Sequence, residues 1–294
     1  IRGTVTLLRR LTGSHLPDMF EFSKYTGAGN DFVVARADER ADATGPELAR
    51  RVSSRRSGVG TDGLILVYPR PGGIRVRFFN PDGSEFSTCG NGSRCAARYA
   101  ADEGLVDPDG FVLETPAGEI EARVESDRVG LDYRIEVGMR GPLTVEGPVG
   151  PTDSWLVHIG VPHLVLPLEV LPEGPIEEIC RPLRSLETLG PEGANVNFVS
   201  LSDPTTGAIR TFERGVEAET LACGSGSMAA VFALLAHGSG GDRVTLRVRG
   251  GDELEIRIGD TRRPDGGQRD VRLAGPAVRL FEGRFPDSIF TPRD

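Results

Sequence analysis

The sequence predicts an α+β protein made of two similar halves, and three observations support this. The pattern Cys-Gly-x-Gly-Ser occurs twice, beginning at Cys89 and again at Cys223. Each copy opens a run of helical character, at residues 93–103 and 227–237. The elements around each copy follow one order: glycine turn, helix, two strands, cysteine turn, central helix, hairpin. A duplicated domain with pseudo-twofold symmetry would place the two matching turns face to face across one cleft.

In the first half, alternating apolar residues bounded by Gly, Pro, Asn and Asp predict strands. An amphipathic stretch with proline near its start, Gly45–Ser57, predicts a helix. Glycine-rich turns are expected at 27–32 and 58–63. The expected strands are Phe20–Tyr25, Val33–Ala37, Leu64–Tyr68, Ile74–Phe79, Phe111–Thr115, Glu119–Val124 and Tyr133–Val137.

The second half repeats this plan after a stretch rich in Gly and Pro, 141–152, which we expect to be a domain boundary. A short helix is expected at Pro175–Arg184, and a hairpin is expected across Gly250 and Gly251. The expected strands are Trp155–Ile159, Leu164–Pro167, Asn195–Leu201, Ile209–Glu213, Val244–Arg249, Glu253–Ile258, Val271–Leu273 and Ala277–Glu282.

The composition limits the classes of function. The chain has 294 residues, a net charge of -9 and 38% hydrophobic residues, enough for one large or two medium domains. Nucleic-acid and bilayer-surface proteins need basic patches, so the acidic balance argues against both. No apolar run approaches the roughly 20 residues of a membrane span. Because the cysteines come without a secretion signal, we expect reduced thiols in the cytoplasm.

Lysine is almost absent, since Lys24 is the only lysine among 34 basic residues. A pyridoxal-phosphate enzyme needs a lysine for its Schiff base, and a P-loop needs a lysine after glycine. Lys24 does not stand in a phosphate-loop pattern. The four cysteines lack Cys-x-x-Cys spacing and no histidine cluster joins them, so a metal site is not expected. We therefore expect chemistry without a cofactor.

Each cysteine turn is suited to bind an anion. Glycines just before a helix leave backbone N–H groups open to a ligand, and a helix start carries roughly half a positive charge. A carboxylate fits such a site. The same position lowers the pKa of a thiol from about 8.5, so we expect Cys89 and Cys223 to ionise readily. Two such turns suggest one substrate held between two thiols.

Two facing thiols can invert a carbon that bears hydrogen. One acts as a thiolate that removes the proton, and the other as a thiol that delivers a proton to the opposite face. Without pyridoxal phosphate, the carbanion would be stabilised by N–H donors at the two helix starts. We therefore favour cofactor-independent racemisation or epimerisation of an amino acid.

The motifs around these turns make a resemblance specific. They are Phe79-Asn80-Pro81-Asp82-Gly83-Ser84-Glu85 before Cys89-Gly90-Asn91-Gly92, then Gly215 and Glu219-Thr220 before Ala222-Cys223-Gly224-Ser225-Gly226, and the opening Gly27-x-Gly29-Asn30-Asp31-Phe32. The chain resembles the diaminopimelate epimerase family over residues 19–285. The resemblance implies two domains, each a mixed β-barrel around a central helix, with the last strand returning to the first domain.

The resemblance also implies a reaction, the interconversion of LL- and meso-diaminopimelate in lysine and cell-wall precursor synthesis, and it implies roles for residues. Cys89 and Cys223 would be the acid/base thiols, and His163 and Glu213 would help to ionise and position them. The α-carboxylate would be bound by Gly90, Asn91, Gly224 and Ser225. The distal end of the substrate would be held by Asn30, Asn80, Asn195 and Arg214. The chain departs from the family at Val161, where many members have asparagine.

These considerations divide the chain into four segments. Residues 1–18 are expected to be an N-terminal extension outside the fold, since Met19 is a more natural start. Residues 19–140 with 276–285 would form the N-terminal domain, and 141–275 the C-terminal domain. Residues 286–294 are expected to be a mobile tail.

Other functions stay open at this point. A racemase of histidine or of a proline derivative would keep both thiols but not the asparagine–arginine set for the distal end. A thiol redox protein would cycle the two cysteines as a disulfide, and a non-catalytic amino-acid-binding protein would typically have lost one of them. The expected partner is a small amino-acid substrate, with no nucleic acid and no membrane. A homodimer is left open.

The remaining cysteines and histidines have ordinary structural explanations. Cys95 lies within a helix and Cys180 on a short amphipathic one, so both are expected to pack in cores. His15, His158 and His237 are expected to be structural or on the surface. Among the histidines only His163 is expected to face the cleft, from the turn in which it lies.

Overall fold

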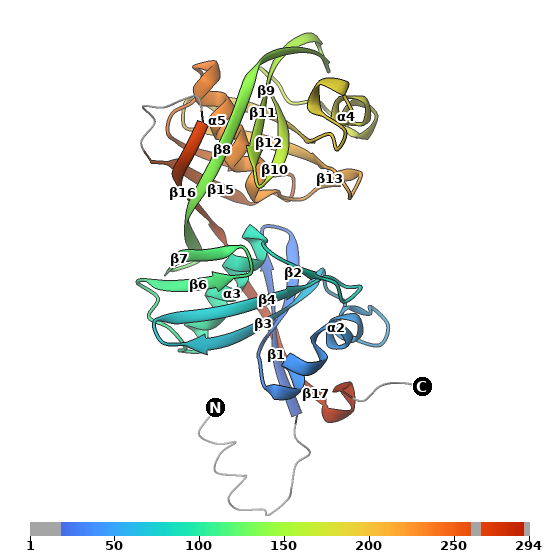
Figure 1. The fold of residues 1–294 in the computed structure, drawn as a ribbon, viewed down its shortest axis with the longest axis vertical. Coiled ribbons are helices and arrows are strands. Elements are labelled where there is room, and N and C mark those ends of the chain that lie inside the picture. The colour runs from blue at the N-terminus through green and yellow to red at the C-terminus, as the bar shows by residue number, and fades with distance from the viewer. Residues whose placement is uncertain (1–18, 260–265, 291–294) are drawn as a thin grey trace, which may run out of the picture.

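The structure, a computed structural model, describes residues 19–259 and 266–290. Two β-rich domains lie one above the other along the long axis (Figure 1). In this part of the chain, 17 strands form one continuous hydrogen-bonded sheet. The sheet closes into two barrels, each around one central helix. The predicted fold class is therefore confirmed, whereas the predicted extension at 1–18 lies outside the described residues.

The N-terminal barrel closes through a strand from the far end of the chain. Strand β8 pairs with β16 (Gly266–Pro276), and the next strand, β17 (Val278–Pro286), pairs antiparallel with β1. The last strand therefore returns to the first domain, as the resemblance implied. The other strands around this barrel are β1 (Met19–Gly27), β2 (Asn30–Arg36), β3 (Gly63–Arg70), β4 (Gly73–Phe79), β6 (Phe111–Thr115), β7 (Gly118–Glu125) and β8 (Arg128–Gly147).

The C-terminal barrel shares β8 and β16 with the first. Its remaining strands are β9 (Gly150–Ile159), β10 (Val161–Pro167), β11 (Asn195–Asp203), β12 (Thr206–Glu213), β14 (Arg243–Arg247) and β15 (Glu253–Ile258). Strand β9 pairs with β8 and β15 pairs with β16, which closes the ring. The short strands β5 (Glu85–Phe86) and β13 (Ala218–Thr220) precede the two cysteine turns.

The two barrels have the same topology, which confirms the duplicated order of elements. Parallel neighbours need a crossover, and each barrel has two such pairs joined by helices. In the first, β2–β3 are joined by α2 (Glu39–Ser53) and β4–β6 by α3 (Gly90–Asp102). In the second, β10–β11 are joined by α4 (Glu177–Arg184) and β12–β14 by α5 (Gly224–His237).

The domains are joined by strands rather than by a linker. The first part of β8 pairs with β7, as Glu121 opposite Asp132 shows, and its later part pairs with β9, as Gly138 opposite His158 shows. The Gly- and Pro-rich stretch at 141–152 is thus the β8–β9 hairpin. A strand that crosses between barrels keeps its backbone N–H and C=O groups paired in both, so no loop is needed.

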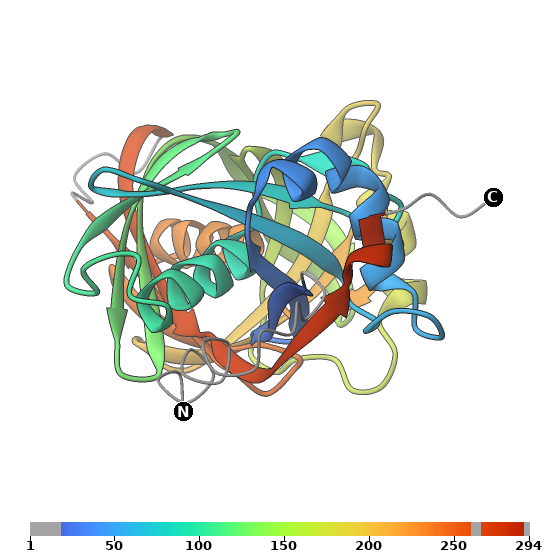
Figure 2. The same cartoon turned by 90° about the horizontal axis from the view of Figure 1, so that it is seen from below.

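The central helices α3 and α5 are buried inside their barrels; Figure 2 shows α3 surrounded by strands, with α5 beyond it. Helix α5 is apolar on all sides, which is typical of a helix buried all round. Both helices begin at the expected cysteine turns. None of the described helices is long and apolar enough to cross a bilayer.

Helix α2 begins earlier than the sequence suggested, because Asp38 caps it. The Asp38 carboxylate accepts a hydrogen bond from a backbone N–H of the first turn at 2.8 Å. Pro46 then lies inside the helix, where its missing N–H leaves the Asp42 carbonyl without its helical partner. Arg77 supplies that partner at 3.3 Å.

Residues 287–290, which were expected to belong to a mobile tail, have a defined place in the fold. Residues Asp287–Phe290 form a short 3-10 helix, η2, that packs on α2. Ile289 is buried there, and Arg51 donates hydrogen bonds to the carbonyls of Ser288 and Ile289 at 3.1 and 2.8 Å. Residues 291–294 lie outside the described part of the chain.

One ion pair joins β12 to β13, the short strand that precedes the second cysteine turn. Arg210 of β12 and Glu219 of β13 are 9% and 10% exposed and lie 2.6 Å apart. Glu219→Ala would leave the buried guanidinium unpaired, so we expect the free energy of unfolding to fall by about 3–5 kcal/mol. Urea unfolding measures this. Glu255→Ala, which breaks an exposed pair with Arg243, should cost much less, and equal losses in both variants would contradict the assignment.

Candidate active site

The two cysteine turns meet at the junction of the domains, on either side of one side chain. A Cβ on Gly90 would stand 3.3 Å from Cδ2 of Leu273, and a Cβ on Gly224 would stand 3.1 Å from the same atom. Leu273 belongs to the shared strand β16. The absence of a side chain at both glycines therefore allows the two helix starts to approach this leucine together.

A cavity of about 920 Å³ opens beside these turns and draws residues from both domains. Both Cys89 and Cys223 line it. Of the other residues predicted for the site, seven line it as well: Asn30, Asn80, Gly90, Asn91, Glu213, Gly224 and Ser225. The structure therefore brings together both thiols and most of the groups expected around them.

Each thiol is the N-cap residue of its central helix. Cys89 Sγ accepts a hydrogen bond from the Gly92 N–H at 3.3 Å, and Cys223 Sγ lies 3.5 Å from the Ser225 hydroxyl. The first N–H groups of a helix have no partner within it. Each turn therefore presents a thiol and backbone donors to the same cavity, an arrangement that suits a bound carboxylate.

The expectation that these turns lower the thiol pKa is wrong. Burial raises the pKa of Cys89 above its ordinary value, and burial followed by the negative charge of Glu213 raises the pKa of Cys223 to about 12. Withdrawing a thiolate from water costs more here than the N–H donors return. Both thiols are therefore mainly protonated at neutral pH.

Glu213 is the acidic group that faces Cys223. It ends β12, lines the cavity, and its carboxylate accepts a hydrogen bond from Thr220 at 2.6 Å. Because its charge opposes ionisation of the thiol, Glu213→Gln should lower the pKa of Cys223. With one pKa unit equal to a tenfold change in thiolate, we expect alkylation of Cys223 to become about tenfold faster at about pH 8.

Iodoacetamide labelling followed by peptide mass spectrometry would measure this rate. The matched control is Glu217→Gln, because Glu217 lies in the same loop but pairs with Arg184 at 2.7 Å and does not line the cavity. Equal labelling of Cys223 in both variants would show that Glu213 does not act on the thiol.

His163 does not line the cavity, contrary to its expected place in a turn facing the cleft. It is fully buried on β10, and burial lowers its pKa to about 3, so the imidazole is neutral. Its Nδ1 lies 3.2 Å from Asn197 Nδ2, while its Nε2 has no hydrogen-bond partner among the residues that the structure describes. Asn197 packs behind the Cys223 turn, since a Cβ on Gly226 would stand 2.4 Å from its Oδ1. His163 is therefore linked to that turn through Asn197.

Asn195 and Arg214 also lie away from the cavity lining. Asn195 Oδ1 accepts a hydrogen bond from the Arg214 backbone N–H at 2.8 Å, and the Arg214 guanidinium is paired with Glu192 at 2.8 Å. Their predicted role at the distal end of a substrate stays a prediction. It would require Arg214 to exchange Glu192 for the ligand.

Asn30, Asn80 and Asn91 do line the cavity and are held by side-chain hydrogen bonds. Asn91 Nδ2 donates to Asn30 Oδ1 at 2.7 Å, and Asn30 Nδ2 donates to Asp62 Oδ2 at 3.0 Å. Asn80 donates to Ser84 at 3.0 Å within its own turn. Lys24, by contrast, is buried beside Asp31 at 3.1 Å and does not line the cavity.

Sequence reasoning missed several residues of the cavity wall, among them Tyr133 and His158. His158 was expected to be structural or on the surface, yet it lines the cavity from β9, and Tyr133 lines it from β8. Burial raises the pKa of Tyr133 well above its ordinary value, so its phenol is neutral. The alternation of β8 indicates a strand, but only the crossing of β8 between the barrels directs Tyr133 toward the cavity.

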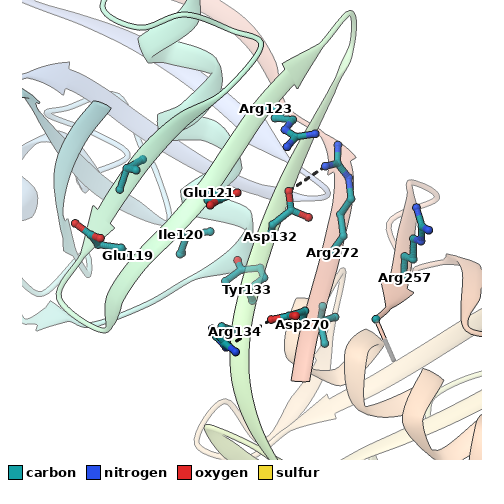
Figure 3. A pocket seen from close by; sticks show the side chains of 13 residues that line it. Glu119, Ile120, Glu121, Arg123, Asp132, Tyr133, Arg134, Arg257, Asp270 and Arg272 are labelled. Carbon is teal, nitrogen blue, oxygen red and sulfur yellow. Dashed lines mark hydrogen bonds and ion pairs between the residues drawn. The ribbon is translucent and has the colours of Figure 1, made fainter. Parts of the chain in front are cut away.

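A second hollow of about 720 Å³ lies beside the first and shares Tyr133 with it (Figure 3). Its charges are largely paired: Arg272 contacts Asp132 at 3.0 Å, and Arg134 lies 3.7 Å from Asp270. A lining that mixes positive and negative side chains favours neither an anionic nor a cationic ligand. The cavity with the two thiols is therefore the candidate active site.

Comparison with known proteins decides the family. The family model described as diaminopimelate epimerase matches residues 22–141 and 155–269. This chain belongs to the diaminopimelate epimerase family. It is 35% identical to the diaminopimelate epimerase of Hydrogenobaculum sp., covering 91% of this chain and 99% of that protein. It is 37% identical to that of Methanothrix thermoacetophila, covering 92% and 98%.

The fold of this chain also occurs in solved structures of other proteins. A PhzF-family phenazine biosynthesis protein of Bacillus anthracis superposes with a TM-score of 0.68 at 14% identity, covering 91% of this chain and 99% of that one. A hydroxyproline epimerase of Agrobacterium vitis superposes with a TM-score of 0.61 at 16% identity, covering 91% and 92%. At such identities the likeness shows the fold alone.

Proposed function

We propose that this protein epimerises diaminopimelate between its LL and meso forms by proton transfer between Cys89 and Cys223. The relatives at 35% and 37% identity are each matched over almost their whole length. Both are named diaminopimelate epimerase and are isomerases. The observation that carries the mechanism is the placement of both thiols: each is the N-cap of a pseudo-equivalent central helix, and both line one cavity.

The two steps balance without a redox partner. The thiolate of one cysteine takes the α-proton, the C–H bond breaks, and its electron pair stays on the α-carbon and its carboxylate. The thiol of the other cysteine then gives its proton to the opposite face. The inverted product leaves, and the negative charge has moved from one sulfur to the other, so the next turnover in the same direction needs a proton exchange that restores the first state.

The helix starts supply what the carbanion needs. The open N–H groups after Cys89 and Cys223 can bind the α-carboxylate and remain near the charge that develops on it. Fixed dipoles in a site closed to water stabilise such charge without reorganising. This chemistry uses the groups of the chain alone, so we propose that it proceeds without a cofactor.

The discriminating experiment follows the α-proton. Reduced protein is incubated in deuterated water with LL-diaminopimelate, without pyridoxal phosphate, and loss of the α-proton signal and appearance of the meso isomer are followed together. Histidine, proline and hydroxyproline run alongside. We expect exchange and inversion with diaminopimelate only, because the cavity asparagines and Arg214 suit a second amino-acid end.

Other outcomes separate the alternatives. Inversion of another amino acid, without inversion of diaminopimelate, would keep the two-thiol mechanism and reject the substrate. Absence of exchange with any amino acid in fully reduced protein would reject the racemase mechanism and favour a redox or binding role.

The setting of the reaction is also a proposal. All four cysteines are free thiols, which suits a reducing compartment such as the cytoplasm, where the meso product would supply lysine and cell-wall precursors. The partner we propose is the small amino-acid substrate, with no nucleic acid and no membrane. A homodimer stays a prediction that light scattering would test.

A further inference from the structure

Arg94 is a buried cation that the proposed reaction does not use. It lies in α3 one turn after Cys89 and is 0% exposed. Its guanidinium makes hydrogen bonds only to uncharged acceptors: Nη2 to Asn91 Oδ1 at 2.7 Å, Nη1 to the Gly90 carbonyl at 3.3 Å, and Nε to the Pro276 carbonyl at 3.3 Å. Within 19–259 and 266–290, no carboxylate is hydrogen-bonded to it. A buried charge without a counter-ion is costly and calls for an explanation.

The guanidinium is held directly behind the Cys89 turn. On one side it contacts Gly90 and Asn91, both of which line the cavity. On the other side lies the shared strand β16, where a Cβ on Gly275 would stand 3.2 Å from Arg94 Nε. The positive charge is thus fixed between the anion-binding turn and the strand that joins the domains.

Arg94 determines how two asparagines of the cavity are oriented. Because it is a donor only, it binds the Oδ1 of Asn91, so the Nδ2 of Asn91 must point to Asn30. Asn30 then accepts through Oδ1 and turns its own Nδ2 toward Asp62. One buried cation therefore fixes the donor and acceptor pattern along this wall.

The second cysteine turn has no such cation. Met228 stands as far after Cys223 as Arg94 stands after Cys89, and it is buried at the cavity wall. The acidic group Glu213 lies beside Cys223 instead. The pseudo-twofold symmetry of the backbone is therefore broken in charge, with a positive group behind one thiol and a negative group next to the other.

We propose that Arg94 is a positioning residue that fixes the two cavity asparagines and makes Cys89, rather than Cys223, the thiol that ionises more readily before substrate binds. The inference rests on the proposed function and deepens it. The enzyme without substrate would then form a thiolate more readily on one face than on the other, and so would be prepared for one of the two isomers.

The charged groups around the two thiols shift the thiol pKa values in the directions that the proposal requires. Burial is the largest influence on Cys89 and raises its pKa; Arg94 lowers it and Glu213 raises it. The ionisable groups whose charges act on Arg94 itself are Cys95, Tyr133, Cys89 and Asp252. For Cys223 both of the leading influences, burial and Glu213, raise the pKa.

The test compares the labelling of the two thiols in substrate-free protein. Arg94→Met gives the first turn the residue of the second, so Cys89 should be alkylated by iodoacetamide about tenfold more slowly at about pH 8, with Cys223 unchanged. Arg94→Lys keeps the positive charge but loses the planar set of guanidinium donors that orients the asparagines. Cys89 labelling should therefore stay near the rate of the unmodified protein, while KM for diaminopimelate rises about tenfold. Arg98→Met, one turn further along α3 and outside the cavity, is the matched control.

The outcomes are separable from those of the activity assay, because labelling needs no substrate. Equal Cys89 labelling in Arg94→Met and Arg98→Met would overturn the proposal even if epimerase activity is found. Should Arg94→Met fail to fold, Arg94→Lys decides alone: slow Cys89 labelling, or an unchanged KM, would reject the assigned role.

Discussion

Alanine at either Cys89 or Cys223 should stop the interconversion of LL- and meso-diaminopimelate, with kcat lowered by about 10³-fold or more. Each thiol serves one face of the α-carbon, and no other group of the cavity wall can replace it at the start of its helix. Because the two act as a unit, the double variant should be little slower than either single one.

Exchange of the α-proton without inversion distinguishes the two thiols more sharply than loss of inversion does. A variant with one remaining thiol can exchange the α-proton of only the isomer that presents its hydrogen to that thiol. Cys89→Ala and Cys223→Ala should therefore exchange opposite isomers in deuterated water. Cys180→Ala removes a buried thiol from the α4 region and should keep both exchange and inversion. Inversion by either catalytic variant at a rate near that of the unmodified protein would refute the two-base mechanism.

The second large effect is on pH dependence. Burial raises the thiol pKa of both cysteines, to about 12 for Cys223. The base must be a thiolate, and below its pKa the thiolate fraction grows tenfold for each pH unit. We therefore expect kcat/KM, which reports on the free enzyme, to rise about tenfold per unit between about pH 6 and pH 8.

Labelling provides the matched measurement. The alkylation rates of Cys89 and Cys223 should rise over the same pH range, and in urea the same thiols should titrate near their ordinary value of about 8.5. A kcat/KM that stays flat below about pH 8, or labelling that is faster in the folded protein than in urea at equal pH, would contradict protonated thiols.

The local chemistry of the site could be predicted from the chain itself. Glycines that follow a cysteine and precede a helical run have one physical meaning, a helix start open to an anion, and Cys89 and Cys223 do cap α3 and α5. The repeated order of elements indicated a duplication, and the paired crossover helices confirm it. Such features depend on neighbours in sequence, so periodicity and turn chemistry are sufficient to find them.

Other features depend on contacts between distant segments. The expected boundary at 141–152 proved to be a hairpin, because only the pairing of β8 with β7, β9 and β16 reveals a strand shared by two barrels. His163 was expected at the cleft but is enclosed behind Asn197. Tyr133 and His158 line the cavity, although no local sequence pattern predicts that position for either of them.

The sequence by itself determined which groups the proposed chemistry uses: two thiols, each at the start of a helix, and no lysine suited to pyridoxal phosphate. The tertiary structure decided their electrostatics. Burial at the domain junction reversed the expected pKa shift, and the buried Arg94 on one side with Glu213 on the other made two similar turns unequal. The physical reason is that a local motif sets which dipoles surround a sulfur, whereas desolvation and distant charges depend on everything that packs around it.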